Sequence, residues 1–281
     1  MLRWLATTLT ATLAGGSAHA GCCGGASPLP MWLDRSEAVL VGAGIDARVG
    51  VLRWDARGQV RTASGASDAL TPRLAVAWRP TRHVQLSATL PAVVRHVRTS
   101  TSQAWGAGVG DLDLGLALDP FTPAGTHLPF LTLRTRLPTG RSGEEATAAL
   151  AADTTGEPGT TLRLGAGIQG GARTLVRFEA DAGPRLTPTR TGVVLGLGGA
   201  VGGPVGDARL SGTLRTEVLW PDADSGVVTA STRAGLLATL PFPRGRGWVS
   251  ADLELPIPGL GVEAPIGVGL GGGAAFVGLR R

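Results

Sequence analysis

The chain has 281 residues, a formal net charge of +5, 44 Gly, 19 Pro and no Tyr, and all 26 of its basic residues are Arg. Glycine at this level disfavours long helices, because each interior Gly costs about 1 kcal/mol relative to Ala. The Arg residues are dispersed and mostly lie close to an acid. Without a basic cluster or an aromatic platform, this composition argues against a nucleic-acid partner.

The N-terminus has the pattern of an export signal. Arg3 is followed by an apolar stretch over residues 4–13 and then by Ala18-His19-Ala20, a small-x-small sequence. This pattern predicts a signal peptide at residues 1–20, cleaved after Ala20, and therefore an exported protein.

A leader at residues 21–37 is expected to precede a single domain at residues 38–281. The leader could fold into that domain as a partial plug or stay outside it, and both possibilities remain open. Its Cys22 and Cys23 are the only cysteines of the chain. A lipidated Cys22, a vicinal disulfide and two free thiols are all compatible with the sequence, whereas a metal site would need further Cys or His nearby.

Beyond the leader, apolar and polar residues alternate in about twelve segments, as they do in strands with one apolar face. In chain order, the expected strands cover residues 38–55, 70–78, 83–90, 109–118, 128–137, 160–169, 176–181, 192–201, 209–220, 227–240, 248–255 and 262–279. The pattern is clearest in the strand at 209–220. There Leu210, Leu214 and Val218 share one face, and Arg215 and Glu217 lie on the other.

The connections between these strands also alternate in length. The turns after residues 70–78 and 160–169 are short, whereas the polar segments 99–107 and 138–158 are long. Short turns on one side and long loops on the other are typical of bacterial outer-membrane barrels.

We therefore predict an all-β fold, a single antiparallel transmembrane β-barrel of about 12 strands with short periplasmic turns and longer extracellular loops. No window beyond the signal offers the 18 or more apolar residues of a spanning helix, and a closed barrel is the other way to satisfy every backbone group in lipid. A soluble β-sandwich would show the same alternation and is the alternative. Several Trp residues fall near predicted strand ends, as interfacial anchors do.

If the apolar faces point to lipid, the charged faces point into the lumen. The predicted lumen-lining residues, which are candidates for setting selectivity, are Asp46, Arg48, Asp111, Asp113, Arg134, Arg136, Arg163, Arg177, Glu179, Asp181, Arg209, Arg215, Glu217, Arg233, Asp252 and Glu254. These charges could form an ionic network that fills and rigidifies the barrel, or they could line a solute path. A barrel of this size lies between filled eight-stranded barrels and open porins, which favours a narrow or plugged pore.

Catalytic motifs are missing from the sequence. It contains neither a Gly-x-Ser-x-Gly elbow nor a His-Glu-x-x-His pattern. His83 and Ser87 on one strand are the only suggestion of a hydrolase pair. The glycines at 106, 108 and 110 make a poor nucleotide loop, because a strand rather than a helix follows them. We therefore predict no enzymatic activity, no cofactor and no metal.

Two short segments resemble a known family. Gly108-Val-Gly-Asp-Leu-Asp-Leu-Gly-Leu116 is similar to the Gly-x-Gly-Asp-x-x-Leu-Gly segment of the phenol-degradation meta-pathway family of outer-membrane proteins, often called transporter-like. Leu137-Pro-Thr-Gly140 resembles a second recurrent segment of that family. The chain departs from most outer-membrane barrels at its end, Leu279-Arg280-Arg281, where an aromatic residue is common.

The resemblance implies an outer-membrane barrel associated with the uptake of small, often hydrophobic, compounds. The expected function is thus a channel for the passive passage of such solutes across the bacterial outer membrane. The alternative is a non-conducting structural or surface-interaction barrel with a charge-paired, filled lumen. Expected partners are outer-membrane lipid, a small-molecule solute and the barrel assembly machinery, and no nucleic acid.

Overall fold

A computed structural model describes residues 33, 37–54, 60–62, 66–98, 101–118, 127–142, 145–157, 159–170, 175–187, 191–220, 228–256 and 264–279. Its strands are β1 (Glu37–Trp54), β2 (Val60–Thr62), β3 (Ala66–Thr81), β4 (Val84–Arg98), β5 (Gln103–Val109), β6 (Leu112–Leu118), β7 (His127–Leu137), β8 (Thr160–Gly170), β9 (Leu175–Leu186), β10 (Thr191–Val205), β11 (Ala208–Trp220), β12 (Thr229–Phe242), β13 (Gly245–Pro256) and β14 (Ala264–Leu279). One short 3-10 helix, η1 (Ala149–Ala151), lies between β7 and β8. Among these residues, no helix is long and apolar enough to cross a membrane.

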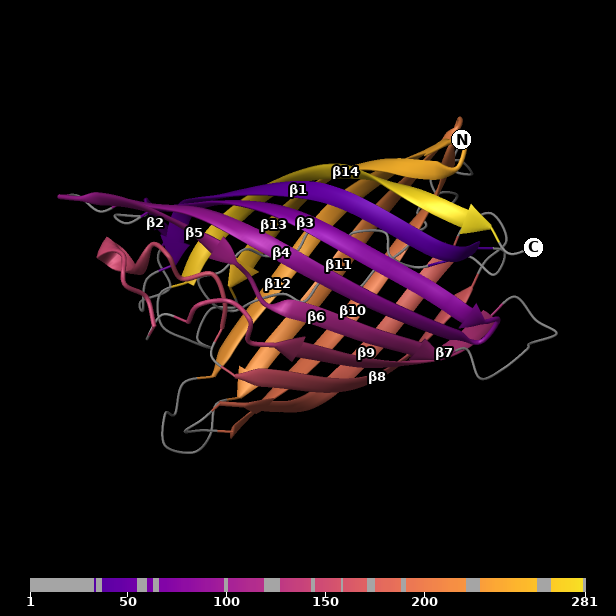
Figure 1. Cartoon of the computed structure of the whole chain (residues 1–281), viewed down its shortest axis with the longest axis horizontal. Coiled ribbons are helices and arrows are strands. Elements are labelled where there is room, and N and C mark those ends of the chain that lie inside the picture. Colours follow the sequence, from indigo (N-terminus) through magenta and orange to yellow (C-terminus); the bar gives the residue numbers. More distant parts are fainter. Residues whose placement is uncertain are drawn as a thin grey trace, which may run out of the picture.

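The strands form one antiparallel sheet that closes on itself, because β14 pairs with β1 (Figure 1). β2 and β3 pair with successive parts of β1, and β5 and β6 pair with successive parts of β4. β2 and β3 therefore share one strand position in the wall, and β5 and β6 share another. The result is a closed barrel of twelve strand positions, which confirms the predicted fold class. A sandwich of two packed sheets is excluded, since the pairing continues around the whole wall.

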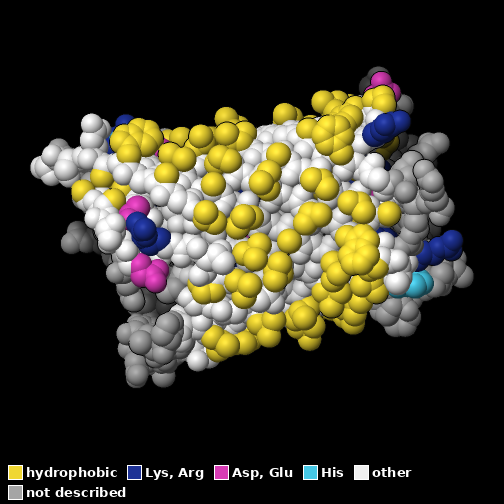
Figure 2. Space-filling model, in the orientation of Figure 1, with side chains coloured by type: hydrophobic (Ala, Val, Ile, Leu, Met, Phe, Trp, Pro, Cys, Tyr) yellow, Lys and Arg dark blue, Asp and Glu magenta, His cyan; other side chains and the backbone are white. Residues whose placement is uncertain are grey.

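Side chains alternate between the outside and the inside of this wall. On β11, Leu214 is 54% exposed and points outward, whereas Arg215 is 8% exposed and points inward. Figure 2 shows hydrophobic side chains spread over the outer face, with charged ones near its two ends. An apolar face of this extent is of the kind that lipid covers in membrane barrels. The predicted assignment of apolar and charged faces is confirmed on this strand.

The connections confirm the predicted asymmetry in length. The turns at 82–83, 206–207 and 243–244 contain two residues each, and all three lie at the same end of the barrel, the short-turn end. The segment at 138–159, which joins β7 to β8, lies at the opposite end. β1 begins and β14 ends at the short-turn end (Figure 1).

One predicted loop is partly wrong. Residues 103–107 of the predicted polar loop 99–107 belong instead to β5, which pairs with residues 92–98 of β4 and also includes Val109, the first residue of the predicted strand 109–118. Gly106 and Gly108 weakened the strand signal in this segment, because glycine inside a strand resembles a turn in the sequence. The connection between β4 and β5 is therefore only the four residues 99–102.

The tryptophans take two different places. Trp78, Trp105 and Trp220 are exposed on the outer face near strand ends, as expected of interfacial anchors. Trp248 is 4% exposed and points inward near the start of β13. It therefore cannot act as an interfacial anchor and instead belongs to the interior of the barrel.

A small apolar cluster fills part of the interior at the short-turn end. Its members are Leu33, Leu40, Ala75, Ala77, Leu237, Trp248 and Ala275. All except Leu33 are inward-facing residues of β1, β3, β12, β13 and β14. Leu33 belongs to the expected leader, whereas the expected signal peptide and Cys22 and Cys23 lie outside the described residues.

Candidate functional site

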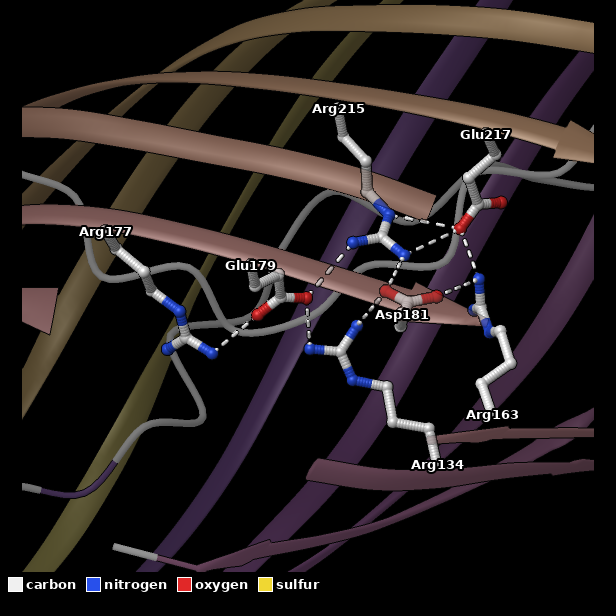
Figure 3. A network of polar contacts seen from close by, with 7 residues as sticks. All are labelled: Arg134, Arg163, Arg177, Glu179, Asp181, Arg215 and Glu217. Atoms are coloured by element: carbon white, nitrogen blue, oxygen red, sulfur yellow. Dashed lines mark hydrogen bonds and ion pairs between the residues drawn. The ribbon is translucent and has the colours of Figure 1, made fainter. Parts of the chain in front are cut away.

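A cluster of charged side chains crosses the interior of the barrel (Figure 3). It projects from inward-facing positions of β7, β8, β9 and β11. We call it the charged belt, and its members are Arg134, Arg163, Arg177, Glu179, Asp181, Arg215 and Glu217. All seven are among the predicted lumen-lining residues. The structure therefore brings together charges that are up to 83 positions apart in the sequence.

Arg215 is the centre of the charged belt. Its Nη1 lies 3.1 Å from Oε1 of Glu179, and its Nη2 lies 2.7 Å from Oδ2 of Asp181 and 2.9 Å from Oε1 of Glu217. Its Nε also donates to Oε1 of Glu217 at 3.0 Å. One guanidinium thus contacts all three carboxylates of the belt, which makes it the residue on which their neutralisation most depends.

The strand register places like charges opposite each other. Arg134 pairs directly with Arg163, and Arg215 pairs directly with Arg233. Like charges at such positions destabilise a sheet unless other groups compensate. The compensation comes from more distant strands, because Nη2 of Arg134 lies 2.5 Å from Glu179 on β9 and Nη1 of Arg163 lies 2.5 Å from Glu217 on β11.

Glycines make these long contacts possible. Arg215 on β11 reaches β9 by crossing the intervening strand β10 at Gly196 and Gly198. A Cβ atom at Gly196 would lie 2.6 Å from Nη2 of Arg215 and 2.7 Å from Oδ1 of Asp181. Glycine at position 196 therefore has a specific cause, which is that the ion pairs of the belt occupy the space that a side chain would need.

The same arrangement recurs across β14. Nη2 of Arg48 on β1 lies 2.6 Å from Oδ1 of Asp252 on β13, and Arg48 also pairs with Glu254. A Cβ at Gly269 of β14 would lie 2.5 Å from the carboxylate of Asp252. Nη2 of Arg233 completes this second charged group, at 2.8 Å from Oε2 of Glu254.

The remaining predicted residues lie elsewhere on the inner wall. Nε of Arg136 donates to Asp113 at 2.9 Å, a pair directly opposed in the register of β6 and β7. Asp46 lies 3.1 Å from Nε of Arg73. Arg209 is exposed at the start of β11, beside the turn at 206–207, so it lies at the rim and not in the belt.

Several of the described interior residues escaped the sequence analysis, among them Arg73 and Phe130. Arg73 is buried on β3, and its alternation with exposed Leu74 and Val76 would have placed it inside by the same rule. Phe130 on β7 is buried beneath Arg177, whose guanidinium carbon lies 4.2 Å from the ring centroid. Such a cation–π contact has no sequence signal, because it joins β7 to β9 across β8 and depends on the register of all three strands.

The charged belt is packed most tightly at β9. The side chains of Arg177 and Asp181 are each 1% exposed, and that of Glu179 is 3% exposed. Arg134 and Arg215, which pair with these acids, keep exposures of 16% and 10%. The charged belt therefore fills the part of the interior next to β7, β8, β9 and β11.

The long segment 138–159 lies against the inner side of β5. Trp105 and Val109 point outward, so the missing side chains of Gly106 and Gly108 face the interior. A Cβ at Gly106 would collide with the backbone of Ala152 and Asp153, and one at Gly108 would lie 3.1 Å from Cγ2 of Thr155. The loop packs against β5 in the space that side chains at these two positions would fill. This packing explains the glycines without a nucleotide-binding loop.

Asp111 joins the two segments on which the family resemblance rests. Its Oδ1 accepts a hydrogen bond from the backbone N–H of Gly140 at 3.1 Å, and its Oδ2 accepts one from that of Glu157 at 2.8 Å. The hydroxyl of Thr139 donates to the carbonyl of Gly110 at 2.7 Å and accepts from the N–H of Leu112. Asp111 is thus an anchor for the loop, and its carboxylate is directed to the loop backbone.

Asp153 holds the tip of the same loop. Its carboxylate accepts hydrogen bonds from the backbone N–H groups of Thr147 at 3.0 Å and Ala148 at 2.9 Å, and it pairs with Arg141. These hydrogen bonds hold the pKa of Asp153 well below its usual range, and the bond from the N–H of Thr147 has the largest effect. The stabilisation is therefore complete above the ordinary Asp pKa of about 3.9 and is lost only as the pH falls through the lowered value.

The loop anchor gives a first prediction. Asp111→Asn replaces one acceptor by an amide that cannot accept from Glu157, and losing bonds to a charged acceptor costs about 1.5–3 kcal/mol. We expect trypsin to cut after the exposed Arg141 about tenfold to a hundredfold faster, as followed by mass spectrometry. Asp113→Asn is the matched control, since Asp113 does not contact the loop in the described residues. Equal cleavage of the two variants would show that Asp111 is not an anchor.

Signs of catalysis or metal binding are few in the described part of the chain. His83 is exposed in the turn before β4, whereas the hydroxyl of Ser87 donates to the carbonyl of Gly115 at 3.5 Å. No group of three or more His, Cys, Asp or Glu residues that could hold a metal ion occurs among the described residues.

A closed antiparallel barrel with an apolar outer face, a charged interior and short turns at one end is the architecture of outer-membrane β-barrels. Solved structures similar to this chain include an outer membrane channel from Pseudomonas putida F1, with 14% identity, a TM-score of 0.66 and coverage of 90% of this chain and 100% of that chain. The translocator domain of the autotransporter NalP from Neisseria meningitidis has 15% identity, a TM-score of 0.51 and coverage of 85% and 88%. At these identities the likeness concerns the fold, and it agrees with the expected outer-membrane barrel. No family model and no curated protein matches the sequence.

Proposed function

We propose that this chain is an outer-membrane channel for the passive passage of small solutes, hydrophobic compounds among them, and that the described conformation is its closed form. The charged belt carries the proposal. Burying an ion costs several kcal/mol even when it is paired, so a barrel that needed only rigidity would be more stable with an apolar filling. A lumen lined with charges is instead suited to water and solutes once the belt opens.

The asymmetry of the barrel supports an orientation in the membrane. Short turns, the start of β1 and the end of β14 at one end match the periplasmic side of bacterial outer-membrane barrels, and the long segment 138–159 then faces the outside. In this orientation the chain is exported by its signal peptide, is inserted by the barrel assembly machinery and contacts outer-membrane lipid through its apolar face. The loop anchored by Asp111 and the charged belt lie in series along the solute path.

A second candidate function is a non-conducting barrel that serves a structural or surface-interaction role. The observation that favours it is the deep burial and pairing of the belt, in which Arg215 neutralises three carboxylates at once. In that case the ionic network would be a permanent filling and would not open.

Conductance in planar bilayers separates the two functions. We expect discrete current steps from protein whose folding is checked by heat-modifiable gel migration. The described belt has four Arg and three acids, so Glu217→Gln raises its net charge to +2, and we expect the reversal potential in a salt gradient to shift toward that of the anion. Asp207→Asn in the exposed turn at 206–207 is the control and should leave it unchanged. A flat trace from folded protein would favour the sealed barrel.

A further inference from the structure

The outer face of the barrel carries an apolar groove that is formed by β3, β4, β6 and β7. Its volume of about 550 Å³ is within the range of about 300–1,000 Å³ that is usual for ligand sites. The side chains that form its walls lie on the outer face and are Val76, Trp78, Leu86, Leu114, Leu116 and Leu133. Because lipid covers this face in a membrane barrel, the groove opens to the hydrocarbon of the membrane.

The groove is built into the register of the strands. Ala88 on β4 lies directly opposite Val76 on β3 and Leu114 on β6. A small side chain between two larger outward ones leaves a depression between their ends. On the neighbouring outward rung, Leu86 lies opposite Trp78, so large side chains border the depression again. The groove is therefore present before any ligand binds.

Trp78 fixes the depth of the groove in the membrane. Its side chain is 51% exposed on the outer face, and it lies three residues before the end of β3 at Thr81. Tryptophan prefers the boundary between the hydrocarbon and the lipid headgroups. One end of the groove therefore lies at the level of the headgroups, and the part between Val76 and Leu114 lies within the hydrocarbon.

A basic turn follows the headgroup end of the groove. Arg82 and His83 form the exposed turn between β3 and β4, and His83 is three positions, or about 10 Å, from Leu86 in the groove wall. Nη1 of the buried Arg79 donates to the carbonyl of Arg82 at 3.4 Å and supports the turn from inside. Arg82 forms no ion pair within the described part of the chain. Figure 2 shows cationic and histidine side chains beside the hydrophobic face at this end.

We infer that the groove binds one acyl chain of an anionic phospholipid of the periplasmic leaflet, with Arg82 at the headgroup phosphate. Hydrocarbon must fill a groove in a lipid-facing wall, since a void would forfeit the dispersion contacts of its lining. The turn selects which lipid enters, because a basic residue at the membrane surface attracts an anionic headgroup. The leaflet follows from the proposed orientation of the barrel, but the site itself does not depend on conduction through the lumen.

Native mass spectrometry of the folded barrel in detergent, titrated with phosphatidylglycerol, measures this binding. We expect the wild type to retain one lipid tightly. Ala88→Trp fills the groove from the outer face, so we expect it to lower the affinity about tenfold, the factor that corresponds to about two fewer buried methylene groups. Ala234→Trp is the matched control, because Ala234 is exposed on the outer face of β12 and does not line the groove.

The role of the basic turn is tested with a second pair of variants. Arg82→Gln should lower the affinity for phosphatidylglycerol about fivefold and leave that for zwitterionic phosphatidylcholine unchanged. Arg244→Gln, in the exposed turn at 243–244 of the same end, is the control and should change neither affinity. Equal losses from the two Arg variants would mean that the headgroup is held by the general charge of this end, which would overturn the assignment to Arg82.

Three results would overturn the groove as a phospholipid site. They are unchanged lipid retention by Ala88→Trp, an equal loss in Ala234→Trp, and a dimer of lipid-free protein that Ala88→Trp abolishes, which would make a second copy of the chain the occupant. Heat-modifiable migration verifies that every variant has folded.

Conductance in planar bilayers keeps this inference separate from the proposed function. If Ala88→Trp loses the lipid while the wild type gives a flat trace, the lipid site is supported and the channel fails. If the wild type conducts while Ala88→Trp retains the lipid, the lipid site is wrong and the channel stands.

Discussion

Arg215→Gln is expected to lower the free energy of unfolding by about 3–5 kcal/mol, the usual cost of removing one partner from a buried ion pair. The reason is that Glu179, Asp181 and Glu217 all lose their shared guanidinium, and each is buried in the lumen. Denaturant unfolding in lipid vesicles, followed by tryptophan fluorescence, measures the change. The effect is expected to be large because Arg215→Gln removes three ion pairs at once.

Arg209→Gln is the matched control for this effect. Arg209 lies on the same strand as Arg215, but it is exposed at the rim beside the turn at 206–207. Surface substitutions of this kind usually change stability by no more than about 0.5 kcal/mol. If both variants lost the same stability, the charged belt would not be the stabilising network that its geometry indicates.

A double substitution tests whether the belt acts as one unit. Arg215→Gln combined with Glu217→Gln removes a cation and an anion together, and residues in one network usually show coupling of about 0.5–3 kcal/mol. We therefore expect the double variant to be more stable than the sum of the two single losses would predict. Strict additivity would mean that the two side chains contribute independently despite the 2.9 Å between them.

Leu214→Arg is expected to destabilise the folded barrel by about 2–4 kcal/mol, the cost of an Arg on the lipid face near the middle of the bilayer. Leu214 is 54% exposed on the outer face and lies near the middle of β11. The same unfolding measurement in vesicles gives the value. The cost arises from the lipid environment, so it should shrink when the protein is studied in detergent micelles.

Thr213→Arg is the control one residue away. Thr213 faces the interior, where its hydroxyl lies 3.4 Å from the carbonyl of Gly235 on β12, and Asp252 lies opposite Gly235 on β13, the next strand along the wall. An Arg at this position remains inside the barrel and meets charged partners, so we expect less than half of the cost of Leu214→Arg. Equal costs for the two variants would contradict the orientation of β11.

The architecture could be predicted from the sequence because a strand fixes the direction of each side chain locally. Alternation of Leu210, Leu214 and Val218 with Arg215 and Glu217 depends only on a period of two, and it predicted the inner and outer faces of β11. The limit of this rule is visible at β5, where Gly106 and Gly108 interrupted the pattern. There the glycines are needed by a loop from a distant part of the chain, and no local signal could show it.

The resemblance to a family had the same limit as side-chain alternation, because it also concerns local segments of the sequence. It indicated that the segments around Asp111 and Gly140 matter, but their sequence spacing did not show that they meet. The structure shows that Asp111 accepts a hydrogen bond from Gly140 itself. Two recurrent segments in different parts of the chain are thus the two halves of one loop anchor.

The sequence by itself determined that this protein is a barrel of about twelve strands with an apolar outside and a charged inside, because side-chain alternation and loop lengths are local properties. Only the tertiary structure decided which charges meet, since Arg215 reaches Glu179 across the glycines of β10 and Arg48 reaches Asp252 across those of β14. It also decided that Trp248 and Leu33 lie within the barrel. The contacts of Arg48 and of the cluster around Leu33 depend on the closure of the sheet at β14 and β1, and that of Arg215 depends on the register of β9, β10 and β11.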